Sequence, residues 1–362
     1  MKVAIVVGGL PFGGIENLIF DISMACKNRD NIEVIIINIS GTGEKINDFI
    51  ENGIKVINLF NSKNGLKVYK ISTIMKLRKL IKELNPDIIH TMQFSGDYFG
   101  RLASIRLKIP IITHIHNIKR ERHLHRRIIN KLLSYKTNLY ISVSKSVKDL
   151  VEKDHNIAGR KNIVLYNAIN LGSFVCKDKR IDDNNINLIA VGRLVPQKNF
   201  HSLIKAFAEL RKCYSNLFLI IVGEGKERNN LERLAKELNV EKYVDFVGYQ
   251  KNVASYYENS HIFVLPSEYE GLPITHIEAI ACGLPAVISE NVPSKEIASK
   301  CSLICNTNPT SIKNNIEKLL NDKGLYKQLA EEAKILKETL EIKNYVENLI
   351  SIYKETIKEY GK

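Results

Sequence analysis

Short apolar runs alternate along the whole chain with longer segments in which apolar residues recur at helical spacing. The runs fall at residues 2–7, 33–39, 55–60, 87–92, 110–115, 138–144 and 162–168, and again at 188–193, 217–225, 243–249, 261–267 and 285–290. Strands that alternate with helices in this way are typical of α/β domains built on parallel sheets. The pattern therefore predicts two consecutive doubly wound halves.

Residues 172–187 interrupt this alternation, because they are polar, charged and without a period. We interpret them as the linker between the halves. The predicted domains are residues 1–172 and 173–344, and residues 345–362 form a last amphipathic helix with no strand after it. In open α/β sheets ligands bind beyond the carboxyl ends of the strands, so functional residues are expected directly after the apolar runs.

The stretch SEYEGLPITHIEAIACGLP holds two glutamates around one predicted helix start. It predicts a loop over 267–273 and an amphipathic helix over 274–282, which Gly283 and the following proline close. Unpaired amides at the start of the helix favour an anion such as a diphosphate. A carboxylate would repel that anion, so Glu270 and Glu278 are expected to accept hydrogen bonds from sugar hydroxyls instead.

Two cations follow the strand at 188–193, in the sequence AVGRLVPQKNF. Arg193 comes directly after the strand, and Lys198 lies five residues further, before a helix that begins near Asn199. Cations of different reach beside a helix N-terminus suit a diphosphate. The spacing alone is equally compatible with a solvated loop.

Glycine-rich turns follow two of the predicted strands. Gly13 and Gly14 occur in VVGGLPFGGIENL, and Gly223 and Gly225 in IVGEGKERNNLERLA. Glycine allows close approach of the backbone and offers amide donors to an anion, although a tight turn would also explain each pair. The first turn is not the Gly-x-Gly-x-x-Gly fingerprint, so a nicotinamide cofactor is unsupported.

Composition places the chain among ordinary two-domain enzymes. At 362 residues it is longer than a single core supports, and 44% hydrophobic with 25% charged residues is typical of a soluble globular protein. No run approaches the roughly 20 apolar residues that span a bilayer, and the first apolar run is too short for a secretory signal. The six scattered cysteines form no Cys-x-x-Cys pair, which favours reduced structural thiols in a cytosolic protein.

The net charge of +14 is concentrated in the first half of the chain. Residues 1–172 hold 27 Lys and Arg against 14 Asp and Glu, whereas the remainder holds 26 against 25. Such asymmetry indicates an anionic surface or polymer facing the first half. Within it, residues 116–136 predict a helix with a mixed basic and apolar face that suits docking to an anionic leaflet; the alternative is an inward apolar stripe with a solvated basic face. The candidate cations are Lys119, Arg120, Arg122, Arg126, Arg127 and Lys131.

The two glutamates, separated by seven residues within PSEYEGLPITHIEAIACGLPAV, resemble the signature of the retaining glycosyltransferases of family 4. Other stretches agree in order: Gly13-Gly14-x-Glu16, THIHN, SVSKSV, LYNAIN, GRLVPQKN, GEG and VGYQKNV. The resemblance covers nearly the whole chain. Within the family, the sequence looks most like bacterial capsule and exopolysaccharide transferases. It implies the GT-B fold, in which two Rossmann-like domains face each other across a cleft and the C-terminal helix crosses back to the first domain.

The resemblance also implies roles for individual residues. Arg193 and Lys198 would neutralise the donor diphosphate, Glu270 would contact the transferred sugar, and Glu278 would hold the ribose hydroxyls. His116 would face the reacting sugar, because it lies closer to the carboxyl end of its strand than His114 does. Other donor-binding positions would be Gly13, Gly14, Gly223, Gly225, Gly271, Leu272, Pro273, Ile274 and Thr275. His276 stands where a hydrophobic residue is commoner in related motifs, and it would either face the donor or pack.

The expected reaction is transfer from an α-linked nucleotide sugar with retention of configuration. Paired carboxylates also suit a glycoside hydrolase, but these two flank a helix start beside the expected phosphate site. No Asp-x-Asp occurs, and no metal or other cofactor is expected, because the two cations and the helix amides supply positive charge. The alternatives are a GT-B sugar-nucleotide 2-epimerase and a non-enzymatic, basic nucleic-acid-binding protein.

The sequence therefore predicts a cytoplasmic transferase associated peripherally with the inner face of the cell membrane. A UDP-hexose or UDP-N-acetylhexosamine is the preferred donor, with GDP-sugars as the alternative. The acceptor would be a lipid-linked or polysaccharide glycan of the cell surface, such as capsule, exopolysaccharide or O-antigen, and no nucleic-acid partner is predicted. The sequence leaves the acceptor's identity and the oligomeric state open.

Overall fold

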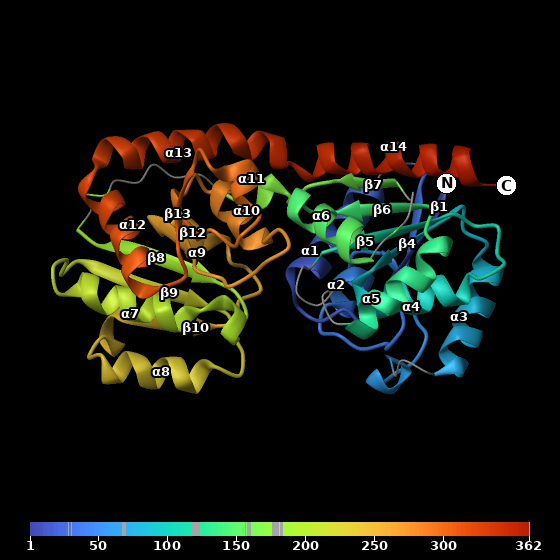
Figure 1. Ribbon diagram of the computed structural model, residues 1–362, viewed down its shortest axis with the longest axis horizontal. Helices are drawn as coiled ribbons and strands as arrows, with labels where there is room; N and C mark the ends of the chain where they lie inside the picture. The colour runs from blue at the N-terminus through green and yellow to red at the C-terminus, as the bar shows by residue number, and fades with distance from the viewer. Residues whose placement is uncertain are drawn as a thin grey trace. The chain divides into compact units, whose positions relative to one another are not determined.

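The computed structural model describes residues 1–27, 29, 31–66, 70–116, 124–155, 157, 161–175, 181 and 184–361, and it divides into two compact units (Figure 1). Unit 1 comprises residues 1–168 and 342–362, and unit 2 comprises residues 169–341. The predicted boundaries, after 172 and 344, lie a few residues later. Unit 2 therefore begins four residues earlier and ends three residues earlier than predicted. Its two ends meet, because Ile169 pairs with Glu341 in a parallel bridge and donates its amide to the Leu340 carbonyl.

Unit 1 is built on a seven-stranded parallel sheet in the order β3-β2-β1-β4-β5-β6-β7. Its strands are β1 (Lys2–Val7), β2 (Glu33–Asn38), β3 (Lys55–Asn58), β4 (Ile88–Met92), β5 (Ile111–Ile115), β6 (Leu139–Ser142) and β7 (Lys161–Val164). Its helices are α1 (Gly14–Lys27), α2 (Ile46–Glu51), α3 (Ile71–Leu84), α4 (Gln93–Ala103), α5 (Leu124–Leu133), α6 (Lys145–His155) and α14 (Ile342–Tyr360).

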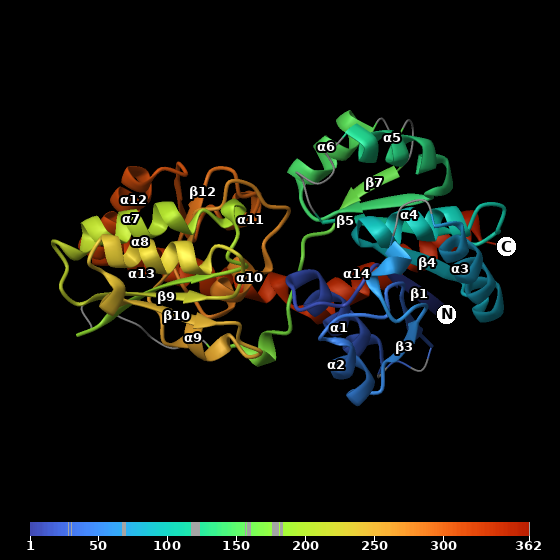
Figure 2. The same cartoon turned by 90° about the horizontal axis from the view of Figure 1, so that it is seen from below.

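Helices cover both faces of this sheet. Helices α3, α4 and α5 share one layer, where Ile89 of β4 joins their apolar core (Figures 1 and 2). The next residue, His90, points to the opposite face and contacts Tyr353 of α14. Burial on both faces explains why the strands are near-continuous apolar runs.

Unit 2 repeats the design with a six-stranded sheet in the order β10-β9-β8-β11-β12-β13. Helices α7, α8 and α12 contribute to the core on one face, and α9 and α10 to the core on the other. The doubly wound α/β prediction is thus confirmed. The strands are β8 (Ile186–Val191), β9 (Leu217–Val222), β10 (Val244–Gly248), β11 (Ile262–Leu265), β12 (Ala286–Ser289) and β13 (Ser302–Cys305). The helices are α7 (Phe200–Arg211), α8 (Arg228–Glu237), α9 (Ala254–Glu258), α10 (Ile274–Ala281), α11 (Lys295–Ala298), α12 (Pro309–Asn321) and α13 (Lys323–Lys337).

Two details differ from the sequence-based expectation. The edge strand β13 was not predicted, because it is only four residues long and lacks a run of branched apolar residues. The predicted linker is also too long, because Ile186 and Asn187 already belong to β8 and pair with β9. Residues 176–180 and 182–183 of that linker lie outside the described residues.

Each sheet has one point at which its strand order reverses, between β1 and β4 in unit 1 and between β8 and β11 in unit 2. Ligands of doubly wound sheets bind beyond the carboxyl ends of the strands at such a point. The loop with Gly13 follows β1, the loop with Arg193 and Lys198 follows β8, and the loop with Glu270 follows β11. Among the described residues, none of the helices has the length and apolar character needed to cross a membrane.

Candidate functional site

Polar contacts join the loops at the reversal point of unit 2. Gln197 donates its side-chain amide to the Tyr269 carbonyl (2.8 Å) and accepts at its own carbonyl from the Glu268 amide (2.9 Å). Asn199 donates to the carbonyls of Pro266 (3.2 Å) and Thr307 (2.7 Å). The loops after β8, β11 and β13 are therefore held together, with Lys198 between the two tethering side chains in the sequence.

Lys198 and Glu270 form a buried ion pair at this point. The ammonium nitrogen of Lys198 lies 2.8 Å from Oε1 of Glu270, and each side chain is only 11% exposed. Gly192 leaves room for the lysine, because a Cβ there would lie 2.8 Å from Lys198 Cε. Arg193 is exposed. An ammonium has three donors, so Lys198 can hold Glu270 and a phosphate oxygen together.

Helix α10 presents its N-terminus beside the loop that carries Glu270. Pro273 occupies its N-cap position, and no side chain of the described residues caps its first turn. The hydroxyl of Thr275 is buried without a hydrogen-bond partner among the described residues. Gly271, Leu272, Pro273 and Ile274 are buried. Uncapped amides and the helix dipole make this end of α10 a suitable place for an anion.

Glu278 lies one turn into α10 and is only 7% exposed. Its Oε2 accepts a hydrogen bond from the hydroxyl of Tyr257 in α9 (2.9 Å). The predicted amphipathic character of α10 is wrong, because every residue except Thr275 is buried. Helices α9 and α13 both pack against α10, and the polar side chain of Glu278 contacts Tyr257 of α9.

His276 belongs to the core of unit 2. Its ring is fully buried, stacks on Phe263 with 5.6 Å between ring centroids, and bonds to the hydroxyls of Ser294 (2.7 Å) and Ser302 (3.2 Å). Burial lowers the pKa of His276 to about 3, so the ring is neutral. Of the two alternatives for this residue, packing is the one that the structure shows.

Gly223 and Gly225 allow the turns after β8 and β9 to approach each other. A Cβ on Gly223, whose φ is +140°, would lie 2.0 Å from the Gly192 carbonyl oxygen. A Cβ on Gly225 would lie 2.3 Å from the Leu194 carbonyl oxygen. Backbone packing therefore requires both glycines, and their contact with a donor stays a prediction.

In unit 1, Gly13 directly precedes α1 and Gly14 is its first residue. The carboxylate of Glu16 lies close to Gly13. A Cβ on Gly13 would lie 2.5 Å from Glu16 Oε2. Gln93 follows β4 and was not predicted as a site residue. Only the fold identifies it, because it places Gln93 at the point where the strand order reverses. Its backbone has a φ of 64°, and its side chain donates to Glu16 and accepts from the Gly8 amide (2.9 Å). Gln93 thus holds the glycine loop.

His116 ends a row of three neighbouring histidine rings on the face of the sheet that α14 covers. The ring of His116 lies 4.0 Å from that of His114, which stacks at 5.4 Å on His90. Tyr353 of α14 bonds to Nδ1 of His90 (2.6 Å). Burial lowers the pKa of His90 and His116 to about 3, and that of His114 well below its usual value. His116 is therefore a neutral imidazole, and His114 is buried between its neighbours.

The basic segment of unit 1 lies partly outside the described residues, including Lys119, Arg120 and Arg122. In α5, Arg127 is partly exposed and Lys131 is exposed. Arg126 differs from the expectation, because its guanidinium lies over the ring of Phe94 at 3.9 Å and so packs towards α4. No group of three His, Cys, Asp or Glu residues in the described part of the chain is placed to hold a metal ion.

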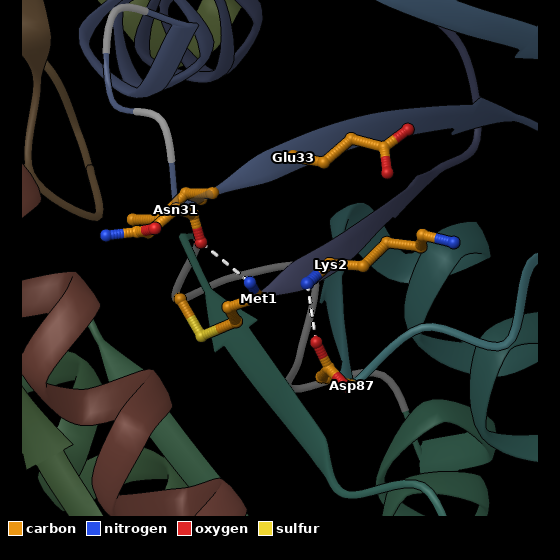
Figure 3. Close-up of a pocket in the computed structure, with 6 residues that line it drawn as sticks. Met1, Lys2, Asn31, Glu33 and Asp87 are labelled. Atoms are coloured by element: carbon orange, nitrogen blue, oxygen red, sulfur yellow. Dashed lines mark hydrogen bonds between the residues drawn. The ribbon is translucent and has the colours of Figure 1, made fainter.

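A pocket in unit 1 lies at the amino ends of the strands, away from the predicted site (Figure 3). Met1 donates its amino group to the Asn31 carbonyl (2.6 Å), and the Lys2 amide donates to the Asp87 carboxylate (2.6 Å). These contacts connect the starts of β1, β2 and β4. The pocket therefore lies at the amino-terminal ends of the strands, whereas ligands of doubly wound folds bind beyond the carboxyl ends.

Comparison with known proteins covers both units. Residues 12–173 match the family described as Glycosyltransferase Family 4, and residues 175–336 match Glycosyl transferases group 1. An uncharacterised glycosyltransferase of Haemophilus influenzae is 30% identical over 352 residues, which cover 92% of this chain and 94% of that one.

A further relative comes from Campylobacter jejuni. It is named a GalNAc-alpha-(1->4)-GalNAc-alpha-(1->3)-diNAcBac-PP-undecaprenol alpha-1,4-N-acetyl-D-galactosaminyltransferase, and it is 26% identical, with 98% of this chain and 99% of that one covered. Among solved structures, Anabaena HepE in complex with UDP and glucose superposes with a TM-score of 0.83 at 18% identity, covering 98% of this chain and 100% of that one.

Proposed function

The chain belongs to glycosyltransferase family 4, and from this premise we propose that it is a retaining enzyme that moves a sugar from a UDP-sugar to a lipid-linked glycan acceptor. The product would enter a cell-surface glycan such as capsule, exopolysaccharide or O-antigen. The observation that carries the proposal is the Lys198–Glu270 pair in front of the uncapped start of α10. It supplies positive charge and a carboxylate at the reversal point of one sheet.

The leaving diphosphate would lie between these positive groups. As the acceptor hydroxyl bonds to the anomeric carbon on the face that UDP leaves, the bond from that carbon to the phosphate oxygen breaks. UDP departs with the electron pair, and the acceptor's proton passes to the diphosphate. Lys198, Arg193 and the amides of α10 stabilise the charge that develops on UDP, so we propose that no metal is needed.

Carboxylates would recognise the sugars of the donor. Glu270, which is paired with Lys198, would accept hydrogen bonds from the transferred hexose or N-acetylhexosamine. Glu278, one turn into α10, would accept from the ribose hydroxyls. The UDP bound to HepE and the undecaprenol diphosphate acceptor named for the C. jejuni relative support the choice of UDP and of a lipid-linked acceptor.

The first experiment is a panel of UDP-glucose, UDP-galactose, UDP-GlcNAc, UDP-GalNAc and GDP-mannose with undecaprenyl-diphosphate-linked sugars as acceptors. We expect one UDP-sugar to give a glycosylated lipid whose new linkage keeps the donor's α configuration, with full activity in EDTA. An inverted linkage, or activity only with Mn²⁺ or Mg²⁺, would contradict the mechanism. Isomerised UDP-sugar without acceptor would indicate an epimerase instead.

Helix α5 supports peripheral contact with an anionic membrane. Leu124, Ile128 and Leu132 lie four residues apart on one side of the helix and are 69%, 51% and 67% exposed. The inward alternative applies to Ile129, which packs against the core, and to the buried Leu133. An exposed apolar row beside Arg127 and Lys131 is the arrangement that inserts between anionic lipid headgroups.

We expect the double variant Ile128→Asp/Leu132→Asp to lose binding to phosphatidylglycerol vesicles by more than about tenfold in sedimentation. Full burial of one Leu or Ile contributes about 1.5–3 kcal/mol, which corresponds to roughly 10- to 100-fold in affinity. Ile335→Asp is the control, because Ile335 is an apolar residue at least as exposed (69%) as Ile128 and Leu132 and lies on α13 of unit 2. Equal binding of both variants and the wild type would rule out α5 as the contact.

A further inference from the structure

Tyr257 is a buried phenol directed at the carboxylate of Glu278. Its hydroxyl lies 2.9 Å from Glu278 Oε2 and 3.0 Å from the Thr275 carbonyl oxygen. A phenol has one proton and can donate it to one of these acceptors at a time. A carboxylate is the stronger acceptor because it is charged. The bond to Glu278 is therefore the dominant one.

The surroundings of Tyr257 fix the position of this hydroxyl. The ring is fully buried, packs edge-on to Phe174 at 6.3 Å and lies 6.1 Å from the ring of Phe263. Burial and the negative charge of Glu278 raise the pKa of Tyr257 well above its usual value, so the phenol stays a donor. The hydrogen bond thus comes from a rigid element of the core and is directed at a nearly buried carboxylate.

We infer that Tyr257 is a positioning residue for nucleotide recognition: it holds Oε2 of Glu278 so that Oε1 faces the ribose hydroxyls of the donor. The inference rests on the proposed function, which gives Glu278 the ribose. A carboxylate that can rotate must be ordered when the ribose binds, and this ordering reduces affinity. One hydrogen bond from a fixed phenol removes that cost before the ligand arrives. Tyr257 itself does not touch the ligand.

The test is a double-mutant cycle between Tyr257→Phe and Glu278→Ala, with UDP affinity measured by calorimetry. Phenylalanine keeps the packed ring and removes only the hydroxyl. We expect Tyr257→Phe to raise the Kd for UDP and the KM for the donor by about 5- to 50-fold, with kcat changed less than about threefold. In the Glu278→Ala background the same change should alter the Kd by less than about twofold, because there is no carboxylate left to orient.

Deoxy nucleotides provide a second measurement. For 2′-deoxy-UDP or 3′-deoxy-UDP, whichever lacks the hydroxyl that Glu278 holds, the effect of Tyr257→Phe on Kd should shrink to the level seen without Glu278. If Tyr257→Phe does not fold, Glu278→Asp replaces it, because the shorter side chain withdraws the carboxylate from the phenol.

The possible results separate the inference from the proposed function. Equal losses from Tyr257→Phe with and without Glu278 would show that Tyr257 acts only through the fold, and an unchanged Kd would show that it has no role. Either result overturns the inference. If Glu278→Ala itself leaves UDP affinity unchanged, the ribose role of Glu278 fails instead, and the inference fails with it.

Discussion

Replacing Lys198 by alanine should lower kcat by about 10²- to 10³-fold while the protein stays folded. Its ammonium lies 2.8 Å from Glu270 and faces the position proposed for the leaving diphosphate. Removing one preorganised donor from developing negative charge typically costs two to three orders of magnitude. The nearly buried Glu270 also loses its ion-pair partner. Turnover is measured with the donor and acceptor that the panel identifies.

Two comparisons separate this effect from a general loss of charge. Lys226→Ala removes an exposed cation from the neighbouring turn after β9 and should retain at least half of the activity. Lys198→Arg keeps the charge but brings a larger, planar guanidinium next to Gly192 and Glu270, so it should restore turnover only in part. A folded Lys198→Ala protein with wild-type kcat would contradict the role of Lys198.

Replacing Glu270 by glutamine should reduce kcat by at least about 100-fold and change the Kd for UDP by less than about fivefold. The amide keeps the size and shape of the side chain but removes the charge that pairs with Lys198 and binds the sugar hydroxyls. UDP carries no transferred sugar, so its binding should respond weakly. The measurements are UDP calorimetry and the initial rate of transfer.

Glu268→Gln is the matched control, because Glu268 is exposed on the same loop and only its backbone amide bonds to Gln197. It should behave like the wild type in both assays. A Glu270→Gln enzyme that keeps its kcat, or one that loses UDP binding and turnover to the same degree, would show that Glu270 does not act on the transferred sugar.

Local sequence signals were enough for the elements that frame the site. The predicted helix over 274–282 agrees with α10 to within a residue, because Gly283 takes a φ of +68° and a proline follows soon after. The apolar runs predicted the remaining twelve strands in the described part of the chain. The short strand β13 carried no comparable signal. The burial of α10 on all sides was not predicted, because α9 and α13, which pack against it, are distant from it in the sequence.

The pairings within the site could not be predicted, because they join residues far apart in the sequence. The sequence motifs identified Lys198 and Glu270 as site residues. They did not indicate that the two side chains form an ion pair. Tyr257 and Gln93 had no sequence signal, since a buried tyrosine and a glutamine after a strand are common in any α/β domain. Their roles depend on which acceptor the fold places opposite the hydroxyl or the amide.

A crystal structure of the protein with UDP tests the proposed diphosphate site most directly. We expect the diphosphate to lie within hydrogen-bond distance of Lys198 Nζ and the first amides of α10, with Arg193 beside it and the ribose hydroxyls on the carboxylate of Glu278. A structure in which UDP occupies another part of the chain, with Lys198 still contacting only Glu270, would contradict it.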